Sequence, residues 1–245
     1  MNNKNVKKVM DIVDNLVDNF ITTITYKSTK EDCINIGDAY IENNVVYLLD
    51  SNHKFWAIDL KEKSPTVICI SGKAQNGKDT TATYLYDYLT KKGKKSVIIH
   101  YADLLKFICQ KYFRWNGVKD DNGRTLLQKV GTDIVRKREP NYWVDFVTGL
   151  IKLFKDEWDF VLIPDTRFPN ELSCITNANL KLKHIRVTRP NFKSPLSEEQ
   201  QKHPSETALD NTVADYNLIN DSTLNDLYKK IEKIGEELLN EQTGN

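Results

Sequence analysis

The sequence predicts an α/β fold, in which a parallel sheet carries helices on both faces and follows a small N-terminal α+β module. From residue 66 onward, short β-branched runs alternate with helical periodicities, as is typical of parallel strands joined by helical crossovers. Before residue 61, one amphipathic stretch precedes short strands separated by polar turns. Residues 61–65 are polar and end in proline. We therefore expect two domains, residues 1–64 and 65–245.

The N-terminal module is expected to hold a helix over residues 5–22 and a β-meander. The meander strands are predicted at residues 39–41, 45–49 and 55–58. A helix with a small sheet buries little surface alone, so formation of a homodimer is one role open to this module. Contact with another protein of nucleotide supply or replication is the other.

The second domain is expected to begin with a buried strand and to end with an amphipathic helix. The strands are predicted at residues 67–70, 96–100, 160–163, 184–187 and 216–219. The helices are predicted at residues 79–92, 104–113, 124–138, 141–155 and 223–239.

Composition excludes several classes of protein. Among 245 residues, 35 Lys and Arg nearly balance 34 Asp and Glu, so no global field favours nucleic acid or an anionic membrane. The N-terminus does not resemble a signal peptide, and no apolar run approaches the roughly 20 residues of a membrane span. Four widely spaced cysteines predict reduced thiols rather than a zinc site or a disulfide framework. We expect a cytoplasmic protein.

A phosphate-binding motif joins the first strand of the second domain to its first helix. Residues 72–78 match the pattern G-x-x-x-x-G-K of a P-loop, which predicts a P-loop NTPase-type sheet. The glycines let the backbone N–H groups face a phosphate, and the helix N-terminus and lysine add positive charge. We expect ATP to contact Gly72, Ala74, Gln75, Asn76, Gly77, Lys78, Asp79 and Thr80.

Asp79 departs from the usual motif, in which a Ser or Thr hydroxyl binds Mg²⁺ after the lysine. A carboxylate can hold Mg²⁺ directly or through water, and capping of the helix is the alternative. Asp165 follows the strand at residues 160–164, at the sheet edge where ligands bind. The predicted metal ligands are therefore Asp79, Thr80 and Asp165.

Several segments of the chain, in order and spacing, resemble the phage-type deoxynucleoside monophosphate kinases. The resemblance rests chiefly on residues 71–82 and on the segment Asp-Thr-Arg-Phe-Pro-Asn-Glu at residues 165–171. Residues 101–106, 124–136, 189–190 and 203–206 extend it, so that it covers residues 66–240. It implies a P-loop kinase of phage type, acting in a host cytoplasm, that uses ATP and Mg²⁺ to phosphorylate a dNMP.

Phosphoryl transfer needs positive groups around the moving phosphoryl group, and this need defines the candidate catalytic residues. They are Lys78, Asp165, Arg167 and Arg189. Arg124 is expected to hold the acceptor phosphate, Gln128 a base edge, and His203 to close a lid. Tyr142 and Trp143 are expected either to stack on a base or to pack in the core. The substrate-binding set, partly implied by the resemblance, is Asp103, Lys106, Arg124, Gln128, Arg136, Trp143, Arg186, His203 and Glu206.

Two other functions stay open on the sequence. One is a small-molecule kinase with a similar loop, of the phosphomevalonate or dephospho-coenzyme A type. The other is a regulatory protein that binds nucleotide without turnover, which the Asp79 departure and the N-terminal module keep open.

Overall fold

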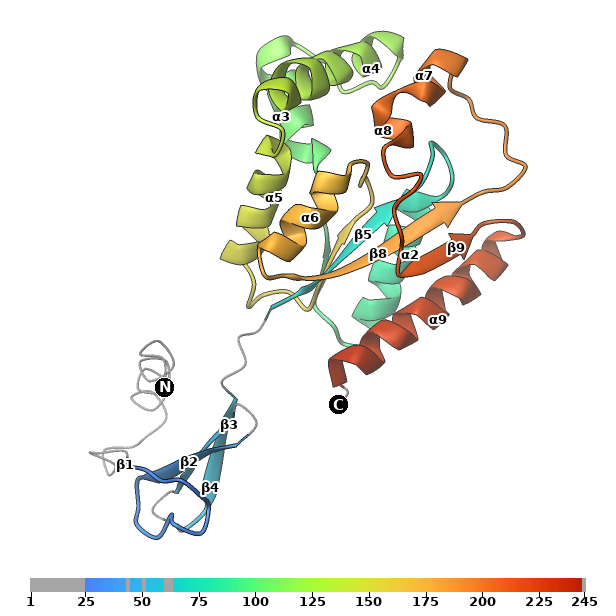
Figure 1. Ribbon diagram of the computed structural model, residues 1–245. Helices are drawn as coiled ribbons and strands as arrows, with labels where there is room; N and C mark the ends of the chain where they lie inside the picture. Colours follow the sequence, from blue (N-terminus) through green and yellow to red (C-terminus); the bar gives the residue numbers. More distant parts are fainter. Residues whose placement is uncertain (1–24, 43–44, 50–51, 60–63, 244–245) are drawn as a thin grey trace. The chain divides into compact units, whose positions relative to one another are not determined.

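The computed structural model describes residues 25–42, 45–49, 52–59 and 64–243 (Figure 1). Contacts divide the chain into two compact units, residues 1–63 and 64–245. The predicted helix over residues 5–22 lies outside the described residues, as do parts of the predicted turns and linker. Each unit is described by itself.

The first unit contains a four-stranded sheet in the order β1-β2-β3-β4. Strands β2 (Asp38–Glu42), β3 (Val45–Leu49) and β4 (Phe55–Asp59) are antiparallel neighbours, which confirms the predicted meander. Strand β1 (Thr25–Tyr26) pairs in parallel with β2 and was not predicted, because two residues leave no periodic signal. The Asp38 carboxylate accepts hydrogen bonds from two backbone N–H groups, those of Ile34 and Asn35, and these bonds lower its pKa.

The second unit is built on a five-stranded parallel sheet in the order β6-β7-β5-β8-β9. The strands are β5 (Thr66–Ser71), β6 (Ser96–Ile98), β7 (Phe160–Ile163), β8 (Lys181–Thr188) and β9 (Tyr216–Ile219). Alternate residues of one strand enter the two opposite cores, as the period of two requires. Ile68 and Ile70 join one core, whereas Val67 and Cys69 join the other.

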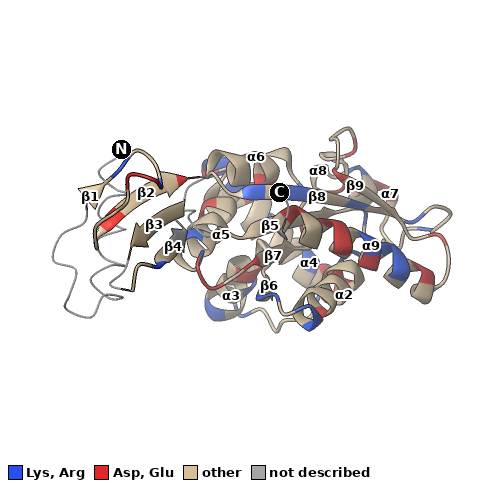
Figure 2. Ribbon diagram, turned by 90° about the horizontal axis from the view of Figure 1, so that it is seen from below, with Lys and Arg blue, Asp and Glu red and all other residues tan. Residues whose placement is uncertain are grey.

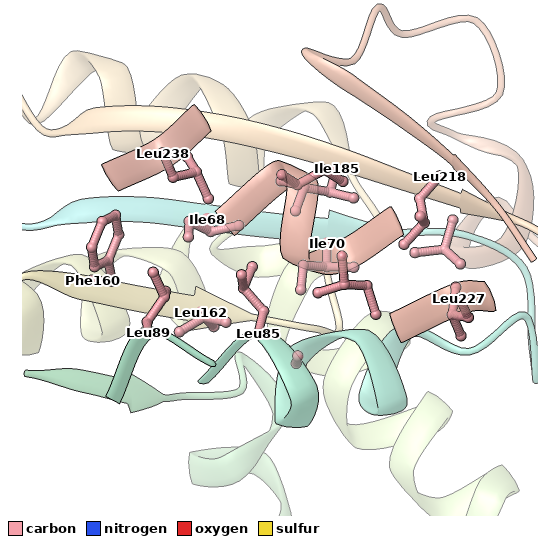
Figure 3. Packing of buried hydrophobic residues seen from close by; sticks show 14 residues of the cluster. Ile68, Ile70, Leu85, Leu89, Phe160, Leu162, Ile185, Leu218, Leu227 and Leu238 are labelled. Carbon is pink, nitrogen blue, oxygen red and sulfur yellow. The ribbon is translucent and has the colours of Figure 1, made fainter. Parts of the chain in front are cut away.

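Helices cover both faces of this sheet, so the predicted fold class is confirmed (Figure 1). On one face, α2 (Lys78–Lys91) and α9 (Leu224–Thr243) pack Leu85 and Leu227 against the strands (Figure 3). On the other face, α5 (Tyr142–Leu153) and α6 (Pro169–Asn177) contribute Val147 and Ile175. Of the helices that the structure describes, none combines the length and apolar character that crossing a bilayer requires.

A third cluster joins the helices that stand beyond the carboxyl ends of the strands. It contains Leu105 and Cys109 from α3 (Ala102–Phe113), Val130 from η1 (Lys129–Arg136), Trp143 from α5, and Trp115. Because these side chains pack together, α3, η1 and α5 are held in fixed positions relative to one another. Basic and acidic residues are interspersed along α9, without a single dominant sign (Figure 2).

Three differences from the sequence prediction concern helices. The continuous helix expected over residues 124–138 is an α-helix, α4 (Asp121–Gln128), followed by η1, which is a π-helix. Helix α6 was not predicted, although proline at its first turn and Glu171 two residues later are start signals. The short helices α7 (Glu198–Lys202) and α8 (Pro204–Thr207) were also not predicted, because so few residues show no period.

Candidate active site

The phosphate loop connects β5 to α2, and its shape depends on two glycines. Gly72 has φ 147°, and a Cβ there would lie 2.2 Å from the Val187 carbonyl oxygen. Gly77 has φ 106° and immediately precedes α2. Asn76 donates a hydrogen bond to the same Val187 oxygen over 3.2 Å. The loop is therefore pressed against the end of β8, and side chains at these glycines would be strained.

Lys78 is buried at the mouth of this loop. Its ammonium donates hydrogen bonds to the carbonyl oxygens of Gly72, over 2.7 Å, and Lys73, over 2.9 Å. Burial, with a further contribution from the Arg167 charge, lowers the pKa of Lys78 to about 8. The positive charge of Lys78 is thus only partly balanced by the groups around it, which favours binding of an anionic ligand beside it.

A cavity of about 420 Å³ extends from the loop to the wall formed by α3, α4 and η1. It brings together many residues that the sequence singled out: Ala74, Gln75, Lys78, Asp79, Lys106, Arg124, Gln128, Arg136, Trp143, Asp165, Arg167 and Glu206. Other predicted residues lie outside its lining: Gly72, Asn76, Gly77, Thr80, Asp103, Arg186, Arg189 and His203. The cavity joins phosphate-binding and substrate-binding candidates in one space.

Two of the predicted arginines are directed elsewhere. The guanidinium of Arg186 donates to the backbone carbonyls of Leu209, Asp210 and Thr212. That of Arg189 lies over the Phe192 ring, 4.3 Å from its centroid. Both lie outside the cavity lining, so the expected contacts of Arg186 with substrate and of Arg189 with the transferred phosphoryl group stay predictions that this arrangement does not support. Arg186 instead ties the segment after α8 to the sheet.

Arg136 and Arg167 enter the cavity and share one carboxylate support. Arg136 forms an ion pair with Glu171 and lies over the Phe168 ring, 4.3 Å from its centroid. The other oxygen of Glu171 accepts from the backbone N–H groups of Arg167 and Phe168. Because this carboxylate is 1% exposed, burial raises its pKa, and the Arg136 charge opposes that rise. Sequence reasoning missed Glu171, although it stands at the third position of α6, where a capping glutamate is common.

Asp165 and Asp79 lie near the loop but differ in what their carboxylates contact. The two oxygens of Asp165 accept from the backbone N–H groups of Tyr101 and Ala102, each over 3.0 Å, and so support the start of α3. The Asp79 side chain is 88% exposed, and its oxygen lies 4.0 Å from His100 Nε2. Over the described part of the chain, no group of three or more His, Cys, Asp or Glu gathers to hold a metal ion. Asp79 still offers the oxygen chemistry that Mg²⁺ prefers.

The wall on the far side of the cavity carries the acceptor-side candidates. Arg124 is fixed by donation from its Nε to the Lys119 carbonyl oxygen, over 3.1 Å. Lys106 pairs with Asp103 over 2.9 Å, and Asp103 also accepts from His100 N. Burial acts to raise the pKa of Asp103, but Lys106 and the His100 N–H lower it overall. Asp103 thus supports Lys106 and the start of α3 rather than lining the cavity.

Trp143 and His203 are both held by hydrogen bonds to the backbone. Trp143 lines the cavity, is 2% exposed and donates from its indole N–H to the Gly131 carbonyl, over 3.0 Å. It therefore packs in the core, and its contact with a base stays a prediction. His203 precedes α8, and its ring nitrogen accepts from Ser205 N over 3.2 Å. His203 therefore caps that helix and does not line the cavity.

Glu206 is the residue of α8 that reaches the loop. One of its oxygens accepts from the backbone N–H of Ala74 over 3.0 Å, and the other forms an ion pair with Arg167. Its backbone carbonyl accepts from the Lys73 ammonium over 2.7 Å. Helix α8 is therefore attached directly to the phosphate loop.

The model of the deoxynucleotide monophosphate kinase family matches residues 95–231. The chain belongs to this family. It is 31% identical to the deoxynucleotide monophosphate kinase of Enterobacteria phage T4 over 120 residues, and 32% identical to that of Escherichia phage RB69 over 113 residues. These alignments cover 48% and 45% of the chain, and 47% and 43% of the two phage kinases. The chain thus spans about half the length of these two phage kinases.

Further similarities extend beyond the named members of the deoxynucleotide monophosphate kinase family. Ictalurid herpesvirus 1 (strain Auburn) encodes an uncharacterized protein, ORF77, that is 28% identical over 171 residues, which are 69% of this chain and 70% of that protein. Among solved structures, the APS kinase CysC of Mycobacterium tuberculosis in complex with AMPPNP and APS covers 73% of the chain and 99% of its own. The TM-score between that structure and this chain is 0.45, and the two sequences are 11% identical.

Proposed function

We propose that this chain transfers the γ-phosphate of ATP to a deoxynucleoside monophosphate, yielding ADP and a deoxynucleoside diphosphate. One observation carries the proposal: a single cavity joins the phosphate loop at Lys78 to a wall that bears Arg124, Gln128 and Arg136. Membership of the kinase family supports the same reaction. Two anionic substrates have to meet in one space with positive charge between them, and this cavity has that arrangement.

The donor phosphates bind at the loop in this proposal. Backbone N–H groups of residues 72–78 and the N-terminus of α2 face the β- and γ-phosphates. Lys78 exchanges its carbonyl partners for phosphate oxygens, which are stronger acceptors for an ammonium. Its burial excludes water, so the charge acts on the phosphates with little screening.

Magnesium fits the residues beside the loop. Mg²⁺ commonly keeps several waters and takes one or two carboxylates together with substrate phosphates. Asp79 is exposed at the cavity and is the carboxylate proposed to hold the ion, and Asp165, which lines the same cavity, is proposed to act through water. When bound, the ion neutralises charge on the phosphate oxygens.

The acceptor nucleotide binds at the opposite wall. Arg124 and Lys106 provide positive charge for its monophosphate, and Gln128 offers an amide to a base edge. Arg136 and Arg167 lie between the two sites and stabilise the charge that spreads over the moving phosphoryl group. Glu171 is a positioning residue in this account, because one buried carboxylate holds Arg136 and the backbone of Arg167.

The test is a coupled assay of ADP formation with ATP, Mg²⁺ and each of the four common deoxynucleoside monophosphates. We expect turnover with at least one acceptor, and a loss of about 100-fold or more in kcat/KM for Lys78→Ala. Lys91→Ala, which changes an exposed lysine at the other end of α2, is the control and should retain activity.

Two outcomes would redirect the assignment. ATP binding without turnover on any deoxynucleoside monophosphate, but with turnover on another phosphorylated small molecule, would favour a different P-loop kinase. ATP binding with no turnover on either class of acceptor would favour a regulatory nucleotide-binding role.

A further inference from the structure

The side chain of Glu206 is seated on the phosphate loop itself. It is 7% exposed, although α8 is a short surface helix. One carboxylate oxygen accepts from the Ala74 N–H over 3.0 Å, and the other pairs with the Arg167 guanidinium. This carboxylate therefore draws on one donor from the loop and one from the segment that follows β7.

Both donors are of the kind that phosphate uses. A backbone N–H of a P-loop and an arginine are standard partners of phosphoryl oxygens, and a carboxylate offers two oxygens that share a negative charge. Glu206 thus presents to this site part of the chemistry of a phosphate group. This reading rests on the function proposed above, since it takes the loop to be the ATP site.

A second set of contacts holds the backbone around Glu206. The Lys73 ammonium donates to the Glu206 carbonyl oxygen and to the Asp210 carboxylate, each over 2.7 Å. Arg167 also donates to the Ser205 carbonyl oxygen over 3.0 Å. Residues 205–210 are therefore attached to the loop and to Arg167 at several points. Two of these attachments use carboxylates: Asp210 pairs with the Lys73 side chain, and Glu206 accepts from the backbone N–H of Ala74.

We propose that Glu206 competes with the phosphates of ATP for the loop, so that nucleotide binding displaces its carboxylate from Ala74 and Arg167. A single N–H cannot serve a carboxylate and a phosphate oxygen equally well, and two anions within a few ångströms repel each other. Binding of ATP is then linked to release of α8 from the loop, and the freed Arg167 becomes available to phosphate. Glu206 is an internal, autoinhibitory occupant of the site.

The test measures ATP binding by titration calorimetry in the presence of Mg²⁺ and without an acceptor, using the full chain. Glu206→Gln keeps the size of the side chain and removes the competing charge. We expect its Kd for ATP to be about tenfold lower than that of the wild type, as one charge-assisted hydrogen bond would give. Glu199→Gln removes the same charge from exposed α7 and should leave the Kd within about twofold of wild type.

A second variant keeps the test informative if Glu206→Gln does not fold. Glu206→Asp retains the charge but withdraws it by one methylene from the Ala74 N–H, so ATP should bind more tightly, though by less than in Glu206→Gln. If the wild type binds ATP and both variants bind it equally well or more weakly, the proposal for Glu206 is overturned and the proposed kinase function is not. If neither the wild type nor the variants bind ATP, the proposed kinase function falls with it.

Discussion

At the scale of single residues, Lys78 shows a conflict between binding and stability. The fold buries this ammonium, and burial with the nearby Arg167 charge lowers its pKa to about 8 from the usual value of 10.5. The folded state therefore disfavours the charged lysine at neutral pH, whereas the unfolded chain does not. We expect Lys78→Met to unfold at higher denaturant concentration than the wild type at pH 7. The gain should be about 1–3 kcal/mol, because the shift is partly offset by carbonyl oxygens that lose a donor.

The pH dependence of that difference follows from the same pKa. Between about pH 8 and 10.5 the unfolded lysine holds a proton that the folded one has released, so wild-type stability rises with pH relative to the variant. In denaturant unfolding experiments, the excess stability of Lys78→Met over the wild type should thus decrease from pH 7 to pH 10. Other titrating groups are common to both proteins and cancel. A variant that is less stable at pH 7, or a difference that does not vary with pH, would contradict this account.

Residue-scale prediction from sequence succeeded where a local pattern defines the geometry and failed where a partner lies far along the chain. Lys78 was placed correctly because its loop is contiguous with a strand and a helix. Arg186 follows a pattern that suits phosphate binding, yet its partners are backbone carbonyls of residues 209–212, which no local signal links to it. The same distance in sequence hid the contact of Glu206 with Ala74.

At the scale of elements, the π-helix η1 is the feature that sequence periodicity misread. It forms part of the acceptor wall, and its Gly131 carbonyl accepts the Trp143 indole N–H. Residues 124–138 show an ordinary α-helical period, so nothing in their pattern indicates the wider, i→i+5 hydrogen-bonded turns of a π-helix. The wider turn depends on packing against α3 and α5, which a sequence window does not contain.

Gly131 gives this element a direct test. A Cβ there would lie 2.6 Å from the Leu105 Cδ2 atom, so Gly131→Ala requires the packed Leu105 side chain to shift or α3 to move away from η1. We expect a loss of about 1–2 kcal/mol in unfolding free energy and a several-fold higher KM for the acceptor, with Kd for ATP unchanged. Gly149→Ala is the matched control, because a Cβ at that exposed helical glycine meets nothing within 4 Å. It should be neutral or stabilising, and equal behaviour of the two variants would argue against a role for η1 packing.

At the scale of the whole molecule, alternation of strands and helices was enough to predict a parallel sheet with two covered faces. It did not predict the order of the strands, because local periodicity is the same whichever neighbour a strand pairs with. The first unit was predicted as a meander from its turns. Strand β1 was not predicted, because it has two residues and pairs with β2, which lies further along the sequence.

The second unit should fold and function by itself. Among the described residues, those that line the cavity fall between residues 74 and 206, and those buried in its hydrophobic clusters between residues 67 and 238. We therefore expect a chain of residues 64–245 to unfold cooperatively and to keep kcat/KM for ATP and its acceptor within about twofold of the full chain, since it retains every described residue of the cavity. The measurement pairs denaturant unfolding with the coupled assay. A cooperative unfolding transition with kcat/KM reduced more than tenfold would show instead that residues 1–63 act on catalysis, and loss of cooperative unfolding would show that the second unit needs them to fold.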